Sequence, residues 1–111
     1  PGVCSVPCDS QTGALSCDSG VQTGVVNVAL GKPAVQSSTA YGADAPRAVD
    51  GNTSGNAVEG SVTCAGDESN MPDQPWWQVD LGASHDLTSI NLWNRTDCCN
   101  WRNKDLWVLV S

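Results

Sequence analysis

Six of the 111 residues in this chain are cysteines, at positions 4, 8, 17, 64, 98 and 99. So many cysteines in a short chain are typical of an oxidising compartment, where disulfides supplement a small hydrophobic core. No CxxC pair of the zinc-finger type is present. The cysteines therefore predict a disulfide-bonded protein that is secreted, extracellular or displayed at the cell surface.

The length and composition restrict the chain to one domain with a modest core, since 40% of its residues are hydrophobic. Its net charge of −7 argues against nucleic acid as a partner, because phosphate contacts require a basic face. No apolar run approaches the roughly 20 residues of a membrane-spanning helix. Membrane insertion is therefore not expected.

The few basic residues are unevenly placed. Arg95, Arg102 and Lys104 are three of only five cations, and they fall within ten positions. This clustering indicates a local binding task. A simpler interpretation is that the three cations form surface ion pairs with Asp97 and Asp105.

Three stretches alternate apolar and polar residues with the period of two that half-buried strands show. Their inward positions are expected to be Trp77, Val79 and Leu81; Thr88, Ile90 and Leu92; and Leu106, Val108 and Val110. A single helical turn is expected at residues 45–49, because Pro46 suits a first helical position. Gly, Pro, Asn and Asp clusters separate these elements, and no long amphipathic helix is present. The pattern predicts an all-β fold, either a sandwich or a jelly roll.

Residues 1–26 are rich in Gly, Ser, Thr and Cys, contain no aromatic residue and show neither strand nor helix periodicity. We expect them to form an extracellular tail pinned by disulfides, or the end of a preceding module. The folded domain is expected to occupy residues 27–111. Because residues 106–111 form an apolar run without a closing turn, we expect a domain that is incomplete at its C-terminus and cut from a longer modular protein.

Four segments carry a resemblance to a known family. They are NVALGKPA with QSS at 27–38, AVDGN at 48–52, PWWQVDLG at 75–82 and NRTDCCNWR at 94–102. The first three resemble the discoidin-like β-sandwich superfamily, which includes coagulation-factor C-type domains. The fourth resembles the sugar-binding segment of F-type lectins of the fucolectin and tachylectin-4 type. The resemblance covers residues 27–111 and implies a discoidin-like jelly roll that lacks its C-terminal strands and binds fucose-type sugars.

The resemblance implies a sugar site built on Arg95, Arg102 and a disulfide between Cys98 and Cys99. Arginines present several donors in a rigid planar fork, which suits sugar hydroxyls, and we expect both to be exposed. Asp97 lies between them in sequence and can hold a guanidinium in place. A disulfide between adjacent cysteines would present a compact apolar knob to the sugar. The alternative is that each cysteine bridges to a distant partner and the arginines are solvated surface residues.

One family feature is missing from this sequence. The third polar contact of the family is a histidine shortly after a cysteine and before the Trp-Trp strand, and no histidine lies between Cys64 and Trp76. Counting forward from Cys64 puts Gly66 at that place, whereas counting back from Arg95 puts Glu68 there. Asp67 or Glu68 could accept hydroxyl hydrogen bonds instead, which would change the preferred sugar. Equally, the loop could have lost sugar binding.

The resemblance also implies a calcium site on the loop that contains the Asp-Gly-Asn sequence. Its expected ligands are the Asp50 carboxylate, the carbonyl oxygens of Arg47, Asn52 and Cys64, and the oxygens of Thr63. Ca²⁺ prefers several carboxylate and carbonyl oxygens on a flexible turn. A further family ligand, a glutamate, would lie beyond this chain. The same three residues could also form an ordinary turn.

Two further features touch these loops. Glycosylation sequons begin at Asn52 and Asn94, and a glycan on Asn94 would argue against sugar binding beside Arg95. The resemblance pairs Cys64 with a cysteine outside this chain, which would leave Cys64 unpaired here or bonded to Cys17.

We therefore expect a noncatalytic module of an extracellular or cell-surface protein that binds fucose-like glycans with the help of calcium. The alternative is a structural or adhesive sandwich of a larger surface or filament protein, which contacts neighbouring modules and has lost sugar binding. An enzyme is not expected. The only histidine, His85, lies in a predicted turn, so no nucleophile and base can be paired.

Overall fold

The computed structural model describes residues 3–6, 12–21, 24–65, 75–99 and 106–111. Its elements, in chain order, are β1 (Val3–Val6), β2 (Thr12–Val21), β3 (Gly24–Asn27), β4 (Ala34–Gln36), η1 (Ala45–Val49), η2 (Ala57–Glu59), β5 (Trp77–Asp80), β6 (Leu87–Asn94) and β7 (Leu109–Val110). Both η elements are short 3-10 helices, and η1 confirms the helical turn predicted at 45–49. Within the described ranges, neither helix has the length or apolar character to cross a membrane.

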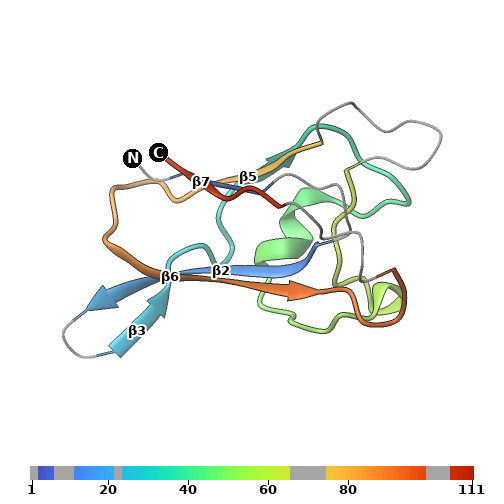
Figure 1. Cartoon of the computed structure of the whole chain (residues 1–111), viewed down its shortest axis with the longest axis horizontal. Coiled ribbons are helices and arrows are strands. Elements are labelled where there is room, and N and C mark those ends of the chain that lie inside the picture. The colour runs from blue at the N-terminus through green and yellow to red at the C-terminus, as the bar shows by residue number, and fades with distance from the viewer. Residues whose placement is uncertain (1–2, 7–11, 22–23, 66–74, 100–105) are drawn as a thin grey trace.

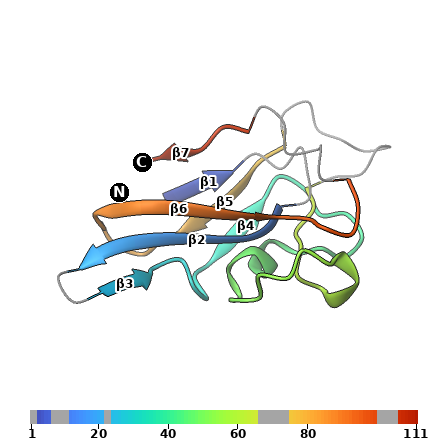
Figure 2. The ribbon, with the colours of Figure 1, turned by 60° about the horizontal axis from the view of Figure 1, so that its bottom comes forward.

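The strands form two antiparallel sheets, with the orders β4-β5-β1-β7 and β3-β2-β6. The two sheets lie as separate layers in Figures 1 and 2, and η1 lies between them at one end. The predicted all-β sandwich is confirmed.

The core between the layers is built mainly on β5. Trp77 and Val79 point inward from this strand and are buried, as the alternation predicted, and Leu81 is buried just beyond its end. These side chains pack against buried residues of η1 and against Cys17 of β2. The Trp77 indole Nε1 donates a 2.9 Å hydrogen bond to the Ala45 carbonyl oxygen, which fixes η1 on the sheet.

The inward face of β6 differs from the prediction at one position. Ile90 and Leu92 are half-buried as expected, but Leu87 replaces Thr88, which is exposed. The reason is a register shift: Asp18 is opposite Ser89 and Ser19 is opposite Leu87, so Thr88 is an extra residue of β6 at this point. An extra residue of this kind is a β-bulge, and it reverses the alternation of side chains along the strand.

The N-terminal segment differs from the expected tail. β1 lies between β5 and β7, and β2 lies between β3 and β6, so both are central strands. Cys4 is opposite Val79, and Cys17 is opposite Ile90. Strand pairing uses backbone hydrogen bonds, which need no periodic pattern of side chains when the neighbouring strands are regular. The composition of residues 1–26 therefore did not reveal that β1 and β2 are central strands.

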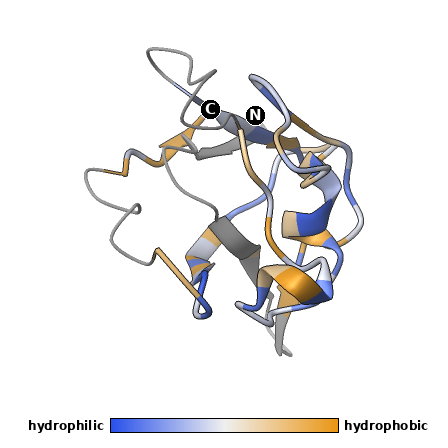
Figure 3. Ribbon diagram, turned by 90° about the vertical axis from the view of Figure 1, so that its right-hand side faces the viewer, coloured by the Kyte–Doolittle hydropathy of each residue, from blue (hydrophilic) through white to orange (hydrophobic). Residues whose placement is uncertain are grey.

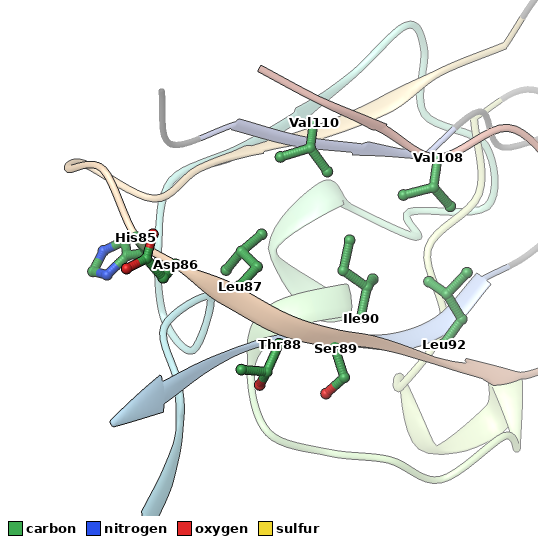
Figure 4. Close-up of a pocket in the computed structure, with 9 residues that line it drawn as sticks. All are labelled: His85, Asp86, Leu87, Thr88, Ser89, Ile90, Leu92, Val108 and Val110. Carbon is green, nitrogen blue, oxygen red and sulfur yellow. The ribbon is translucent and has the colours of Figure 1, made fainter. Parts of the chain in front are cut away.

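A groove of about 670 Å³ remains between the edge strands β6 and β7. Leu87, Ile90 and Leu92 project from β6 toward Val108 and Val110, whereas Thr88 and Ser89 point the other way (Figure 4). His85 lies in the turn before β6 and is half-buried at one end of the groove. β7 is only two residues long, shorter than the strand that the alternation from Leu106 predicted.

Candidate functional site

The first element of the candidate site is η1. Its Pro46 lies in the first helical turn, and Ala45, Ala48 and Val49 are buried in the core. Arg47 is the half-buried exception. Its guanidinium carbon lies 3.9 Å from the point where a Cβ atom on Gly60 would be, so the guanidinium packs over a residue without a side chain. Gly60 has φ +73°, a conformation that favours glycine.

The second element is the loop from Asp50 to η2, which is ordered by short-range hydrogen bonds. The Asp50 carboxylate accepts from the Asn52 N–H at 2.8 Å, and the Asn52 side chain accepts from the Ser54 N–H at 3.0 Å. Asn56 then caps η2 by accepting from the Val58 N–H at 3.1 Å. Side chains of Asp and Asn stabilise turns and helix N-termini in this way.

The third element is the loop after β6, in which Arg95 and Asp97 form a two-point ion pair. Arg95 Nε lies 2.7 Å from Asp97 Oδ1, and Nη2 lies 3.0 Å from Oδ2. The hydrogen bond from Arg95, with a further bond from the Ala57 N–H, lowers the pKa of Asp97 from 3.8 to about 2. The bond to Asp97 also raises the pKa of Arg95. The predicted partnership of these two residues is confirmed.

The Arg95 side chain is only 17% exposed, so it is less open to solvent than we expected from the sequence. Its two hydrogen bonds to Asp97 fix the orientation of the guanidinium. A guanidinium fixed in this way loses little further freedom when it binds a ligand.

The loop after β6 packs directly against the loop before η2, as Figure 1 shows. The Thr96 N–H donates to the Gly55 carbonyl oxygen at 2.8 Å. A Cβ atom on Gly55 would lie 2.6 Å from the Asn94 carbonyl oxygen and 2.6 Å from Thr96 Cγ2. Only glycine permits this approach.

Cys98 and Cys99 are joined by a disulfide, which confirms the predicted pairing of adjacent cysteines. Cys98 is exposed and Cys99 is half-buried. Cys99 has φ +60°, in the left-handed region. The pair therefore places two bonded sulfur atoms in the same short loop as Arg95.

These elements surround a pocket of about 320 Å³, at the small end of the roughly 300–1,000 Å³ range of small-molecule sites. Its lining residues are Tyr41, Ala43, Arg47, Ala57, Val62, Arg95 and Cys99. Figure 3 looks onto this end of the molecule, where η1 and η2 each show hydrophobic residues next to hydrophilic ones. The pocket thus combines guanidinium donors with an apolar wall.

Sequence reasoning missed Tyr41 and the side chain of Arg47 as lining residues. Tyr41 is 76% exposed and has φ +55°, followed by Gly42 with φ +63°. Ala43 N–H closes this tight turn on the Ala40 carbonyl oxygen at 2.9 Å. A tyrosine in the left-handed region is uncommon, and such residues concentrate at functional sites. In the sequence, the pair Tyr41-Gly42 was the feature that could have indicated this turn.

The expected calcium ligands are placed as follows. Asp50 and Asn52 lie on the exposed loop, whereas Thr63 is fully buried, and its Oγ1 has no hydrogen-bond partner. A buried hydroxyl without a partner fits a site for a cation that binds oxygen. The Cys64 carbonyl oxygen already accepts from Ala40 N at 3.0 Å and Gln36 Nε2 at 3.3 Å, which uses both of its lone pairs.

Acidic side chains do not gather at this place in the described part of the chain, where no group of three His, Cys, Asp or Glu residues could hold a metal. Asp67, Glu68 and Arg102 lie outside the described residues. Cys17 and Cys64 are both buried, and they belong to two different core clusters.

Comparison with known proteins identifies the family. The sequence model of one protein family, the NedA-like, galactose-binding domain, matches residues 47–111, which is more than half of the chain. The chain belongs to this family. The predicted F-type lectin-like and discoidin-like domain is thereby confirmed.

Among its relatives, a fucolectin of Anguilla anguilla is 38% identical over 81 residues, covering 68% of this chain and 49% of the relative. Fucolectin-3 of Anguilla japonica is 38% identical over 89 residues, covering 76% and 47%. A pentraxin fusion protein of Xenopus laevis is 38% identical over 58 residues, covering 52% and 13%. The chain thus spans about half the length of the fucolectins it matches. No solved structure is found to match it.

Proposed function

We propose that this chain is a noncatalytic, calcium-dependent carbohydrate-binding module of an extracellular or cell-surface protein, and that its pocket takes a fucose-type sugar. The observation that carries the proposal is the position of Arg95, fixed by Asp97 and lying with Cys99 in one pocket. The names of the fucolectins support the choice of sugar.

The chemistry of the pocket suits a sugar. Sugar hydroxyls both donate and accept hydrogen bonds, and the ring carries C–H patches between them. Arg95 supplies charged donors whose direction Asp97 sets, and charge-assisted hydrogen bonds are the stronger kind. Cys99, Ala57 and Val62 supply an apolar wall for the C–H surface.

Calcium binding is part of the proposal because the loop and Thr63 together offer oxygen atoms. Asp50 supplies the carboxylate, Thr63 supplies the buried hydroxyl that lacks a partner, and the Arg47 and Asn52 carbonyls are the other expected ligands. When bound, the ion would neutralise the carboxylate and hold the loop before η2 in place.

A second candidate function is a structural or adhesive module that contacts its neighbours in a larger assembly. The absence of a histidine between Cys64 and Trp76 favours it, because the family's third polar contact is then lost. This candidate keeps the sandwich and predicts no sugar binding.

A glycan array separates the two candidates. The chain, folded in calcium, should retain fucose-type sugars, and the variant Arg95→Lys should bind them at least about tenfold more weakly because lysine lacks the planar fork. Lys32→Arg, which changes an exposed cation outside the pocket, is the matched control and should bind as the wild type does. A correctly folded chain that retains no sugar would establish the structural module.

A further inference from the structure

The side chain of Arg47 shares the sugar pocket with Arg95 but differs from it in one respect. Arg95 is paired with Asp97 through two hydrogen bonds. Arg47 lines the same pocket, and no carboxylate in the described part of the chain pairs with it. Asp97 therefore offsets the charge of Arg95, whereas no described carboxylate offsets the charge of Arg47.

The position of Arg47 is fixed by its surroundings. Its backbone belongs to η1, which the buried Ala48 and Val49 and the Trp77 hydrogen bond hold in the core. Its guanidinium packs over Gly60, where the φ of +73° favours glycine. The side chain therefore lies along the pocket wall and not in open solvent.

The charge of the pocket is then positive within an acidic protein. Among the residues that the structure describes, the pocket is lined by two arginines and by neither an aspartate nor a glutamate. After Asp97 has offset Arg95, one positive charge remains, in a chain whose net charge is −7. A half-buried cation without a counter-ion has lost part of its hydration and gained no ion pair in return, so an anion that enters the pocket is favoured.

Resting on the proposed sugar-binding function, we propose that the pocket selects a sugar that carries an anionic group, and that Arg47 is the residue that pairs with that group. A carboxylate or a sulfate presents oxygen atoms at the spacing of the guanidinium fork and accepts two parallel hydrogen bonds. A neutral hydroxyl accepts from one N–H and leaves the charge unpaired. Arg47 thus supplies the third polar contact that the missing histidine does not.

Binding to matched sugars tests this selection. The wild-type chain is titrated with a neutral fucosylated glycan, with its sulfated form and with a glycan that ends in a carboxylated sugar. The two acidic forms should bind at least about tenfold more tightly than the neutral one, and added salt should weaken their binding the more strongly. The two acidic arms show whether sulfate or carboxylate is the preferred source of charge.

Variants of Arg47 assign the effect to this side chain. Arg47→Gln should abolish the preference, so that acidic and neutral glycans bind with equal affinity, while Arg47→Lys should recover part of the preference. Lys32→Gln, an exposed cation outside the pocket, is the control and should leave the preference intact. Near-ultraviolet circular dichroism confirms that each variant is folded.

The proposal is overturned if the wild type binds neutral and acidic forms equally, or if Arg47→Gln weakens both by the same factor. A folded chain that binds none of the sugars contradicts the proposed function itself. The two failures are therefore distinguishable.

Discussion

The carbonyl oxygen of Gly55 accepts a 2.8 Å hydrogen bond from the backbone N–H of Thr96, which joins two loops that lie far apart in the chain. The Ala57 N–H adds a 3.3 Å bond to Asp97 across the same contact. As a result, the loop with the expected calcium ligands and the loop with Arg95 form one unit. Ordering one loop should therefore order the other.

Replacing Gly55 by alanine should separate the two loops. The new methyl group would lie within 2.6 Å of the Asn94 carbonyl oxygen and of Thr96, far inside van der Waals contact. Overpacking of this kind costs about 1–3 kcal/mol, and it should also weaken sugar binding because Arg95 moves with its loop. Urea unfolding and glycan titration measure the two effects. Thr53→Ala, at an exposed neighbouring position, should change neither, and a Gly55→Ala chain of wild-type stability would contradict the close contact.

Sequence patterns predicted the strands whose alternation is regular, and the structure shows why they failed elsewhere. The alternation of Trp77 and Val79 correctly identified β5, because that strand has a uniform register against β1 and β4. Thr88 was assigned to the wrong face because the bulge opposite Asp18 and Ser19 depends on the partner strand. The sequence of a strand does not by itself show where its register against the partner strand shifts.

The same limit applies to the pocket. Arg95, Asp97 and the cysteine pair were found because they are adjacent in one segment with a rare pattern. Arg47 was expected to contribute only its carbonyl oxygen. The position of its side chain depends on the packing of η1 and on the bare surface of Gly60, which are tertiary features.

Trp77→Phe should destabilise the fold by more than the smaller volume of phenylalanine alone would. Phenylalanine fills most of the same space but removes the indole donor, so the Ala45 carbonyl oxygen loses its 2.9 Å hydrogen bond in the core. A buried acceptor left without a partner costs about 1–3 kcal/mol. Urea unfolding measures the loss. Trp76→Phe is a matched control, because Trp76 is 44% exposed and should tolerate the change. Equal effects at the two positions would refute the role given to the indole donor.

The ion pair of Arg95 and Asp97 should give the protein a defined response to acid. Because the pKa of Asp97 is lowered from 3.8 to about 2, the pair stabilises the folded state fully above its ordinary pKa, and this contribution is lost as the pH falls toward 2. The stability difference between wild type and Asp97→Asn should therefore be constant from neutral pH to about pH 4 and shrink below it. Urea unfolding along a pH series measures this difference. A difference that shrinks already between pH 7 and pH 5 would show that another group titrates.

The hydroxyl of Thr63 offers a test of the proposed calcium site. It is buried without a hydrogen-bond partner, so Thr63→Val, which has nearly the same shape, should leave the chain equally stable or more stable when a chelator is present. In calcium the order should reverse. A ligand that binds only the folded state stabilises it by about 2.7 kcal/mol at one hundred times its dissociation constant, and the variant should lose much of that gain.

Thermal melting with calcium and with chelator measures both states of the wild type and of Thr63→Val. Asp50→Asn, which keeps the turn but removes the carboxylate charge, should lose the calcium response in the same way. Ser61→Ala is the matched control, because Ser61 is equally buried but its hydroxyl donates to the Asn56 carbonyl oxygen at 3.0 Å. That variant should lose stability equally with and without calcium, since its bond does not involve the ion. If Thr63→Val keeps the full calcium response, the Thr63 hydroxyl is not a ligand, and its burial needs another explanation.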